Sequence, residues 1–124
     1  MKQEVQGTKP VGAYSPGIIA EGRFLYVSGQ GPLRDGHVVE GSIAEQTALA
    51  IENLRAVLEQ GGAELADVVR VGVFLADIGD FAAMNDVYLS LFPAPLPART
   101  TVGAQLPGIK VEIDCVAALP SEGS

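Results

Sequence analysis

The segment VVRVGVFL at residues 68–75 constrains the fold more than any other part of the sequence. Its β-branched and aromatic residues predict a strand, and period-two alternation distributes the side chains over two faces that are both mostly apolar. One face holds Val69, Val71, Val73 and Leu75, and the other holds Val68, Arg70, Gly72 and Phe74. Both faces therefore need cover, unless the second is an ordinary half-exposed sheet surface with scattered valines.

Two amphipathic helices flank this strand in the sequence. The first begins with a capping box, Ser-Ile-Ala-Glu at residues 42–45, and the glycines at 61–62 provide its end. The second begins near Asp80, a good N-cap residue, and Pro93 ends it. Each carries an apolar stripe at helical spacing, formed by Ala48, Ile51, Leu54 and Leu58 in the first helix and by Phe81, Met84, Tyr88 and Leu91 in the second.

The remaining strands are predicted from the same alternation. Residues 24–28, 38–39 and 100–104 are short candidates, and residues 34–37 form a tight turn before the second of them. The last strand, residues 109–119, places Ile109, Val111, Ile113 and Cys115 on one face and Lys110, Glu112, Asp114 and Val116 on the other. This order of elements indicates an α+β fold. Two helices cover only one face of the sheet, so association with further copies is the simplest cover for the other face.

The length, composition and net charge of the chain predict one globular domain, residues 1–124, and disfavour several functional classes. Apolar residues make up 48% and charged residues 19% of the chain, and its apolar runs are far shorter than a membrane span. The net charge of −7 argues against nucleic acid as the main partner, because phosphate binding depends on clustered Lys and Arg. The N-terminus lacks the apolar stretch of a secretory signal, so we expect a cytoplasmic protein. The tail, residues 120–124, is expected to be flexible.

Few residues predict chemistry of their own. The one histidine, His37, lies in the predicted turn, where we expect it to be solvated. The one cysteine, Cys115, lies on the apolar face of the last strand, where we expect a buried hydrophobe. These two residues predict neither a metal site nor a nucleophile–base pair. The segment Gly29-Gln30-Gly31 is too short for a nucleotide-binding loop.

A polar cluster is predicted around Arg99. In the segment PARTT at residues 97–101, Arg99 and Thr101 have the same parity and point to one face of a strand, and Glu112 points to the polar face of a neighbouring strand. An arginine can clamp a carboxylate ligand through paired, charge-assisted hydrogen bonds. A structural salt bridge between Arg99 and Glu112 explains the same residues equally well at this point.

These residues belong to a set of motifs that resembles the RidA/YjgF/L-PSP family. The stretch PARTTV at residues 97–102, followed by Leu106-Pro107 and by the VEI at residues 111–113, resembles the family signature. Further similar segments, in the same order as in the family, are GAYSPG at 12–17, VSGQ at 27–30, the helix at 46–58 with its Asn53, and the stretch from Val73 to Tyr88. The resemblance covers residues 5–119, nearly the whole chain.

The resemblance implies a single chorismate-mutase-like domain, with a mixed, mostly antiparallel sheet, two helices packed on one face, and assembly as a barrel-like homotrimer. It implies clefts between subunits that bind small carboxylates and hydrolyse reactive imino acids, 2-iminobutanoate and 2-iminopropanoate, to 2-oxo acids and ammonia. It implies no metal and no organic cofactor. As catalytic residues it implies Arg99, which would hold the substrate carboxylate, and Glu112, which would orient or activate a water. As substrate-binding residues it implies Tyr14, Ser28, Gly29, Asn85, Arg99 and Thr101.

The chain departs from the archetypal deaminases of this family in two places. Thr101 stands where they carry a cysteine, and the loop at residues 93–96 is a few residues shorter. A second hypothesis is therefore a regulatory trimer that binds small carboxylates without catalysis. A third, an endoribonuclease or translation inhibitor, as some relatives are labelled, is disfavoured by the negative charge and by the lack of a histidine pair for RNA cleavage.

Overall fold

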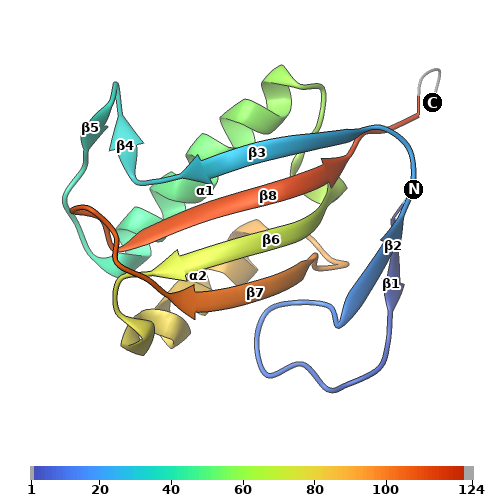
Figure 1. Ribbon diagram of the computed structural model, residues 1–124, viewed down its shortest axis with the longest axis horizontal. Coiled ribbons are helices and arrows are strands. Elements are labelled where there is room, and N and C mark those ends of the chain that lie inside the picture. The colour runs from blue at the N-terminus through green and yellow to red at the C-terminus, as the bar shows by residue number, and fades with distance from the viewer. Residues whose placement is uncertain (1, 122–124) are drawn as a thin grey trace.

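A four-stranded sheet with two helices behind it forms the body of the molecule (Figure 1). The structure is a computed structural model and describes residues 2–121. In chain order the elements are β1 (Lys2–Val5), β2 (Gly17–Ala20), β3 (Phe24–Gln30), β4 (Leu33–Arg34), β5 (His37–Val38), α1 (Ile43–Gln60), η1 (Leu65–Asp67), β6 (Val68–Leu75), η2 (Ile78–Asp80), α2 (Phe81–Leu91), β7 (Ala98–Gly103) and β8 (Val111–Ala118).

The sheet is mixed and mostly antiparallel, as predicted. Its strand order is β3-β8-β6-β7, and only the β6–β7 pair is parallel. A parallel pair needs a crossover connection, and α2 supplies it between β6 and β7. Both helices lie on the same side of the sheet, so its other side, here called the open face, carries no helix of residues 2–121 (Figure 1). The predicted α+β fold with two helices on one face is confirmed.

Helix α1 begins with the predicted capping box. The Glu45 backbone N–H donates to Ser42 Oγ at 3.1 Å, and the Ser42 N–H donates to Glu45 Oε1 at 2.9 Å. The second of these, donated by the Ser42 backbone, is the main cause that holds the pKa of the Glu45 carboxyl below its ordinary value. On the covered side, Ile51, Leu54 and Leu58 are fully buried against the sheet. The stripe that the sequence predicts is therefore the seam between α1 and the strands.

Helix α2 begins where the sequence predicts, with Asp80 as its N-cap residue but without a hydrogen bond from the helix to the Asp80 side chain. The Asp80 side chain makes no capping hydrogen bond, because the turn η2 comes first and Asp80 is its last residue. Asp77 caps this turn instead and accepts the Gly79 N–H at 2.9 Å. Asp80 thus holds the predicted N-cap position but makes no side-chain hydrogen bond there, and the buried face of the helix, with Met84 and Tyr88, agrees with the prediction.

Strand β6 contains an irregularity that alternation did not predict. Its register with β8 shifts between Val68 and Arg70, where Val68 pairs with Ala117 and Arg70 pairs with Val116. The shift turns Val68 to the covered side, where it is fully buried, whereas the sequence placed it on the opposite face. From Val71 onwards the predicted alternation holds.

Strands β7 and β8 carry the residues singled out above. In β8, Val111, Ile113 and Cys115 are buried on the covered side, as predicted, and the carboxylates of Glu112 and Asp114 lie on the open face. Strand β7 begins two residues before the predicted start at residue 100, so Arg99 lies within it.

The remaining short strands form two separate pairs. Asp35 and Gly36, with φ of 51° and 79°, make the predicted turn of a hairpin between β4 and β5. The antiparallel pair β1–β2 was not predicted, because its strands are only four residues long and weakly patterned. No helix of residues 2–121 is both long and apolar enough to cross a membrane. Most of the tail predicted to be flexible, residues 122–124, lies outside the described residues.

Candidate functional site

Arg99 lies in the edge strand β7 and points to the helix-covered side of the sheet. Its register partner, Val71, is fully buried, and only 9% of Arg99 is exposed. Three aromatic rings surround the guanidinium carbon, with centroids 4.8 Å away for Tyr88, 5.5 Å for Phe81 and 5.7 Å for Tyr14. Ring faces attract a cation most strongly where water is excluded, so these contacts help to hold a buried positive charge.

The guanidinium has no carboxylate partner among the described residues. Burial lowers the pKa of Arg99, and Tyr88 and Tyr14 act in the opposite direction. An arginine nevertheless stays charged at physiological pH. Because a buried charge without a counter-charge is costly, the surroundings of Arg99 favour an anionic ligand.

Several buried polar atoms around Arg99 lack hydrogen-bond partners within the described chain. Arg99 Nη1 donates to the carbonyl oxygen of Ala13 at 3.3 Å, whereas Nε and Nη2 have no acceptor. Asn85 Oδ1, Thr101 Oγ1 and the Tyr88 hydroxyl are also unpaired. Buried polar groups in proteins are nearly always paired, so this cluster offers donors and acceptors to a polar ligand. Nε and Nη2 are also the two donors that bind a carboxylate side-on.

The segment of residues 11–15 closes over this cluster. A Cβ added to Gly12 would lie 3.2 Å from Arg99 Nη2 and 3.3 Å from Asn85 Nδ2, so the backbone of Gly12 sits directly against both side chains. The Ser15 N–H donates to the carbonyl oxygen of Pro97 at 3.1 Å and ties the segment to the start of β7. In this arrangement Nε and Nη2 of Arg99 are closed to solvent.

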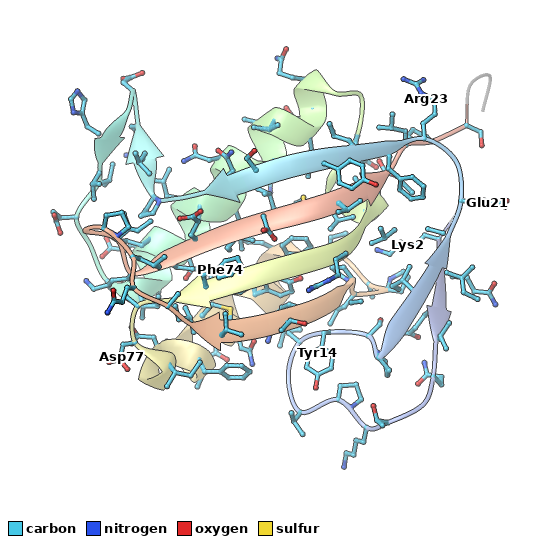
Figure 2. All side chains as sticks on the ribbon, viewed as in Figure 1. Lys2, Tyr14, Glu21, Arg23, Phe74 and Asp77 are labelled. Carbon is cyan, nitrogen blue, oxygen red and sulfur yellow. The ribbon has the colours of Figure 1, made fainter. Side chains whose placement is uncertain are left out.

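A hollow of about 250 Å³ opens beside the cluster of unpaired polar atoms around Arg99. It is lined by Val11, Tyr14, Phe81, Arg99, Thr100 and Thr101. Figure 2 shows Tyr14 on the loop next to β7, and its hydroxyl accepts the Val11 N–H at 3.1 Å. The volume is below that of most drug-sized sites and suits a ligand of a few heavy atoms.

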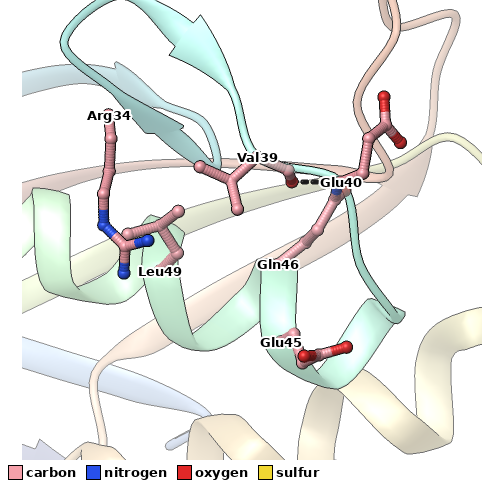
Figure 3. A pocket seen from close by; sticks show the side chains of 6 residues that line it. All are labelled: Arg34, Val39, Glu40, Glu45, Gln46 and Leu49. Carbon is pink, nitrogen blue, oxygen red and sulfur yellow. Dashed lines mark hydrogen bonds between the residues drawn. The ribbon is translucent and has the colours of Figure 1, made fainter.

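A second hollow, of about 150 Å³, lies between α1 and the segment after β5 (Figure 3). Gln46 crosses it, donating to the carbonyl oxygen of Val39 at 2.9 Å and accepting the Lys110 N–H at 2.9 Å. Both polar ends of this glutamine are therefore paired. The hollow is explained by a structural link between α1 and two loops and offers no candidate site.

Glu112 does not share a site with Arg99 in one chain. Strand β6 separates β7 from β8, and Glu112 lies on the open face in register with Phe74, whereas Arg99 lies on the covered side in register with Val71. The prediction that Glu112 stands on a strand next to Arg99 was wrong, because β7 pairs with β6 alone. The same separation rules out a salt bridge between Arg99 and Glu112 within one chain.

Ser28 and Gly29 lie with Glu112. They occupy an irregularity of β3, between the pairs Val27–Cys115 and Gln30–Ile113, and both are exposed. The Glu112 side chain packs directly on Gly29, so close that a Cβ there would lie 2.0 Å from Glu112 Oε1. The candidate residues therefore form two groups. Tyr14, Asn85, Arg99 and Thr101 make the arginine cluster, and Ser28, Gly29 and Glu112 make the glutamate cluster.

Other reactive side chains stay apart from both clusters. His37 is exposed in β5. Cys115 is buried, and burial, reinforced by the neighbouring Asp114, raises the pKa of its thiol to about 12. No group of three potential metal ligands occurs among residues 2–121.

Sequence reasoning missed three contributors to the arginine cluster. Tyr88 and Phe81 were assigned only to the apolar stripe of their helix, yet their rings pack on the guanidinium. Together with Asn85 they are spaced i, i+4, i+7, which places all three on one face of α2 and was a readable signal. The third, the carbonyl of Ala13, is a backbone group and leaves no mark in the sequence.

The comparisons with known proteins agree with this architecture. The family model described as Endoribonuclease L-PSP matches residues 5–119. Two helices on one face of a mixed sheet define the structural class, and the chain belongs to the Endoribonuclease L-PSP family, also called RidA/YjgF. The crystal structure of RidA from an Antarctic Psychrobacter is 33% identical, with a TM-score of 0.74 and coverage of 94% of this chain and 99% of that one.

Curated relatives of similar length carry different names. Protein mmf2, mitochondrial, of Schizosaccharomyces pombe is 50% identical over 105 residues, which cover 81% of this chain and 83% of that protein. A protein of Dermatophagoides farinae named 2-iminobutanoate/2-iminopropanoate deaminase is 40% identical over 112 residues, covering 87% of each. The family of this chain is therefore established, whereas the names of its members indicate different activities and compartments.

Proposed function

We propose that this protein is an imine deaminase that hydrolyses 2-iminobutanoate and 2-iminopropanoate to the corresponding 2-oxo acids and ammonia. The observation that carries the proposal is the buried guanidinium of Arg99 with two unpaired side-on donors, Nε and Nη2, beside a small hollow. This arrangement suits a small anionic ligand with a planar carboxylate. The deaminase name of a 40% identical relative supports the same substrate class.

The catalytic site is proposed to form between chains. The arginine cluster and the glutamate cluster lie on opposite sides of one sheet, so a single chain cannot bring both to one ligand. A second copy that docks on the open face can place its own residues beside the first copy's glutamate cluster. Repetition of such a heterologous contact closes a ring, and a homotrimer is the proposed assembly. Exposed apolar side chains on β3, Phe24 and Tyr26, support an interface there.

The reaction proposed for this cleft needs little from the protein. Arg99 of one copy holds the carboxylate of the 2-imino acid and fixes its C=N carbon in place. Glu112 of a neighbouring copy orients a water and accepts its proton as the oxygen bonds to that carbon. The resulting carbinolamine then loses its C–N bond, the nitrogen leaves as ammonia after protonation, and the C=O of the 2-oxo acid forms. One water is consumed and no redox step occurs.

The test generates 2-iminobutanoate with a threonine dehydratase and measures 2-oxobutanoate release while semicarbazide competes for the imine. Wild type should accelerate release. Arg99→Ala should lower kcat/KM by roughly 10²–10⁴-fold, the loss expected for two charge-assisted hydrogen bonds. Arg99→Lys keeps the charge but not the paired donors, and should fall between the two.

Arg55→Ala is the matched control. Arg55 is a partly exposed arginine of α1 paired with Glu52 at 2.8 Å, away from both clusters, and its removal should leave activity unchanged. Full activity of Arg99→Ala would remove Arg99 from the site. No acceleration by wild type would overturn the deaminase proposal.

A second candidate function is carboxylate binding without catalysis. It is favoured by the fact that the arginine cluster is assembled within one chain, whereas Glu112 is not part of it. This function predicts that 2-oxobutanoate raises the melting temperature of wild type, but not of Arg99→Ala, with no turnover of the imine. A cytoplasmic location stays a prediction, since one relative is named as mitochondrial.

A further inference from the structure

We propose that Gly29 is a positioning residue for Glu112. In this inference, the missing side chain at position 29 provides the space in which the Glu112 carboxyl lies, and so fixes where that carboxyl stands on the open face. The inference rests on the proposed function in one respect, because it assumes that the place of this carboxyl matters for catalysis. Its structural part can be tested without any activity.

The contact between these residues is unusually close. A Cβ built on Gly29 would lie 2.0 Å from Oε1, 2.8 Å from Cδ and 3.0 Å from Cγ of Glu112. Cβ atoms essentially never approach other atoms closer than 3.0 Å. The Glu112 side chain therefore occupies the volume that any side chain at position 29 would need, and it lies along the backbone of β3.

The backbone at position 29 gives no other reason for a glycine. Among the glycines that the structure describes, those in the left-handed region are Gly22, Gly36, Gly62 and Gly108, with positive φ between 75° and 114°. Gly29 is not among them, so an alanine can adopt its φ without strain. Space for Glu112 is thus the requirement that the structure shows at this position.

The local strand geometry brings position 29 under Glu112. Between the pairs Val27–Cys115 and Gln30–Ile113, two residues of β3 face one residue of β8, which is the arrangement of a β-bulge. Bulges redirect side chains and are common beside active sites. Just beyond this bulge, Asn53 Nδ2 donates to the carbonyl oxygens of Gly31 and Leu33, both at 2.9 Å, and fixes the chain there to α1. The surface on which Glu112 rests is therefore held in place.

A second glycine–carboxylate pair on the same face shows what is particular to Glu112. A Cβ on Gly72 would lie 2.4 Å from Asp114 Oδ1, but that oxygen accepts the Gly72 N–H at 3.0 Å. The Glu112 carboxyl makes no hydrogen bond to any described residue. Its oxygens therefore stay available for a water or a substrate, and contact with Gly29 is what places them.

Four variants test the inference in the imine assay: Gly29→Ala, Glu112→Gln, their double variant, and Gly72→Ala as the matched steric control. Gly29→Ala should lower kcat about 10–10²-fold with KM nearly unchanged, because a displacement of about 1 Å at a catalytic group has effects of this size. Gly72→Ala displaces the other carboxylate and should keep kcat within about threefold per assembled protomer. In the Glu112→Gln background, Gly29→Ala should cause no further loss, because the two changes act on one group.

Two kinetic outcomes would overturn the inference. One is a Gly29→Ala protein with the kcat of wild type. The other is an equal fold-loss from Gly29→Ala with and without Glu112→Gln, which general damage to the strand would produce. If wild type itself is inactive, the proposed function fails, and crystal structures of wild type and Gly29→Ala decide the positioning role. A carboxyl displaced from position 29 supports that role, and an unmoved one contradicts it.

Discussion

The two faces of the sheet differ in what a single chain completes. The covered face is closed by two helices and holds the fully buried aliphatic residues of β6 and β8. Alternate side chains of the same strands point to the open face. They include the carboxylates of Glu112 and Asp114, and Tyr26, which is 75% exposed. The covered face thus supplies the stability of the chain, whereas the open face leaves the Glu112 carboxyl without a hydrogen bond to any described residue.

Arg99 shows that the division is not simply between apolar and polar residues. It belongs to the covered face, but it lies in the edge strand β7, where segment 11–15 closes over it in addition to the rings of Phe81 and Tyr88 from α2. A cation buried at an edge is close to the surface where a neighbouring copy can dock. The difference between the faces therefore predicts a site divided between chains, and it can be challenged in three ways.

The largest effect is expected when defective copies are mixed. Arg99→Ala and Glu112→Gln should each lose about 10²-fold or more of the deaminase activity alone. After denaturation and refolding together in equal amounts, about one quarter of the clefts in a closed ring combine an intact Arg99 from one copy with an intact Glu112 from the next. Activity should then return to about a quarter of wild type, as measured in the imine assay.

The control for mixing is a preparation in which the two variants are refolded separately and combined only afterwards. Without exchange of chains, it should stay inactive. A mixture that remains inactive although mass spectrometry shows mixed assemblies would mean that Arg99 and Glu112 do not act in one cleft between chains.

A smaller effect separates the faces by stability. Ile113→Ala, on the covered side of β8, should cost about 2–5 kcal/mol in the free energy of unfolding at every protein concentration, because it leaves a cavity in the core. Tyr26→Ala, on the open face, should change the unfolding of the dilute chain by only about 0.5 kcal/mol. It should instead shift the assembly toward smaller species, as measured by light scattering. The contrast between the faces breaks if Tyr26→Ala costs the dilute chain as much as Ile113→Ala.

The parts of this fold that sequence predicts are those governed by near neighbours along the chain. The capping box at Ser42, the apolar stripe of α1 and the alternation of β8 each depend on spacings of a few residues, and all are found. The side on which Val68 lies was predicted wrongly, because the register shift between β6 and β8 depends on pairing with a distant strand. Likewise, the Asp80 side chain makes no capping hydrogen bond at the start of α2, and Asp77 caps the preceding turn η2.

The candidate site shows the same limit. Parity placed Arg99 and Thr101 together, and family motifs added Tyr14 and Asn85, which the structure brings into one cluster. Neither the parity of residues in a strand nor the family motifs predict that β6 lies between the strands of Arg99 and Glu112, because strand order is a property of the whole sheet. The roles of these residues stay a prediction that the variants above test.

The smallest effect concerns Cys115, which lies on the covered side of β8 next to the open-face residue Asp114. Burial, and to a smaller extent the negative charge of Asp114, raises the pKa of its thiol from 9.0 to about 12. The folded state therefore binds the thiol proton more tightly than the unfolded state does. This contribution to stability is fully present below about pH 9 and is lost as the pH rises toward 12. At neutral pH, wild type and Cys115→Ala should therefore show no difference in the slope of stability with pH. Above pH 9, the unfolding free energy of wild type should fall faster than that of the variant.

A second measurement tests the burial of Cys115 directly. A chromogenic disulfide reagent at pH 8 should modify its thiol only after unfolding, whereas rapid modification of the folded protein would show that the covered face is not closed at this position.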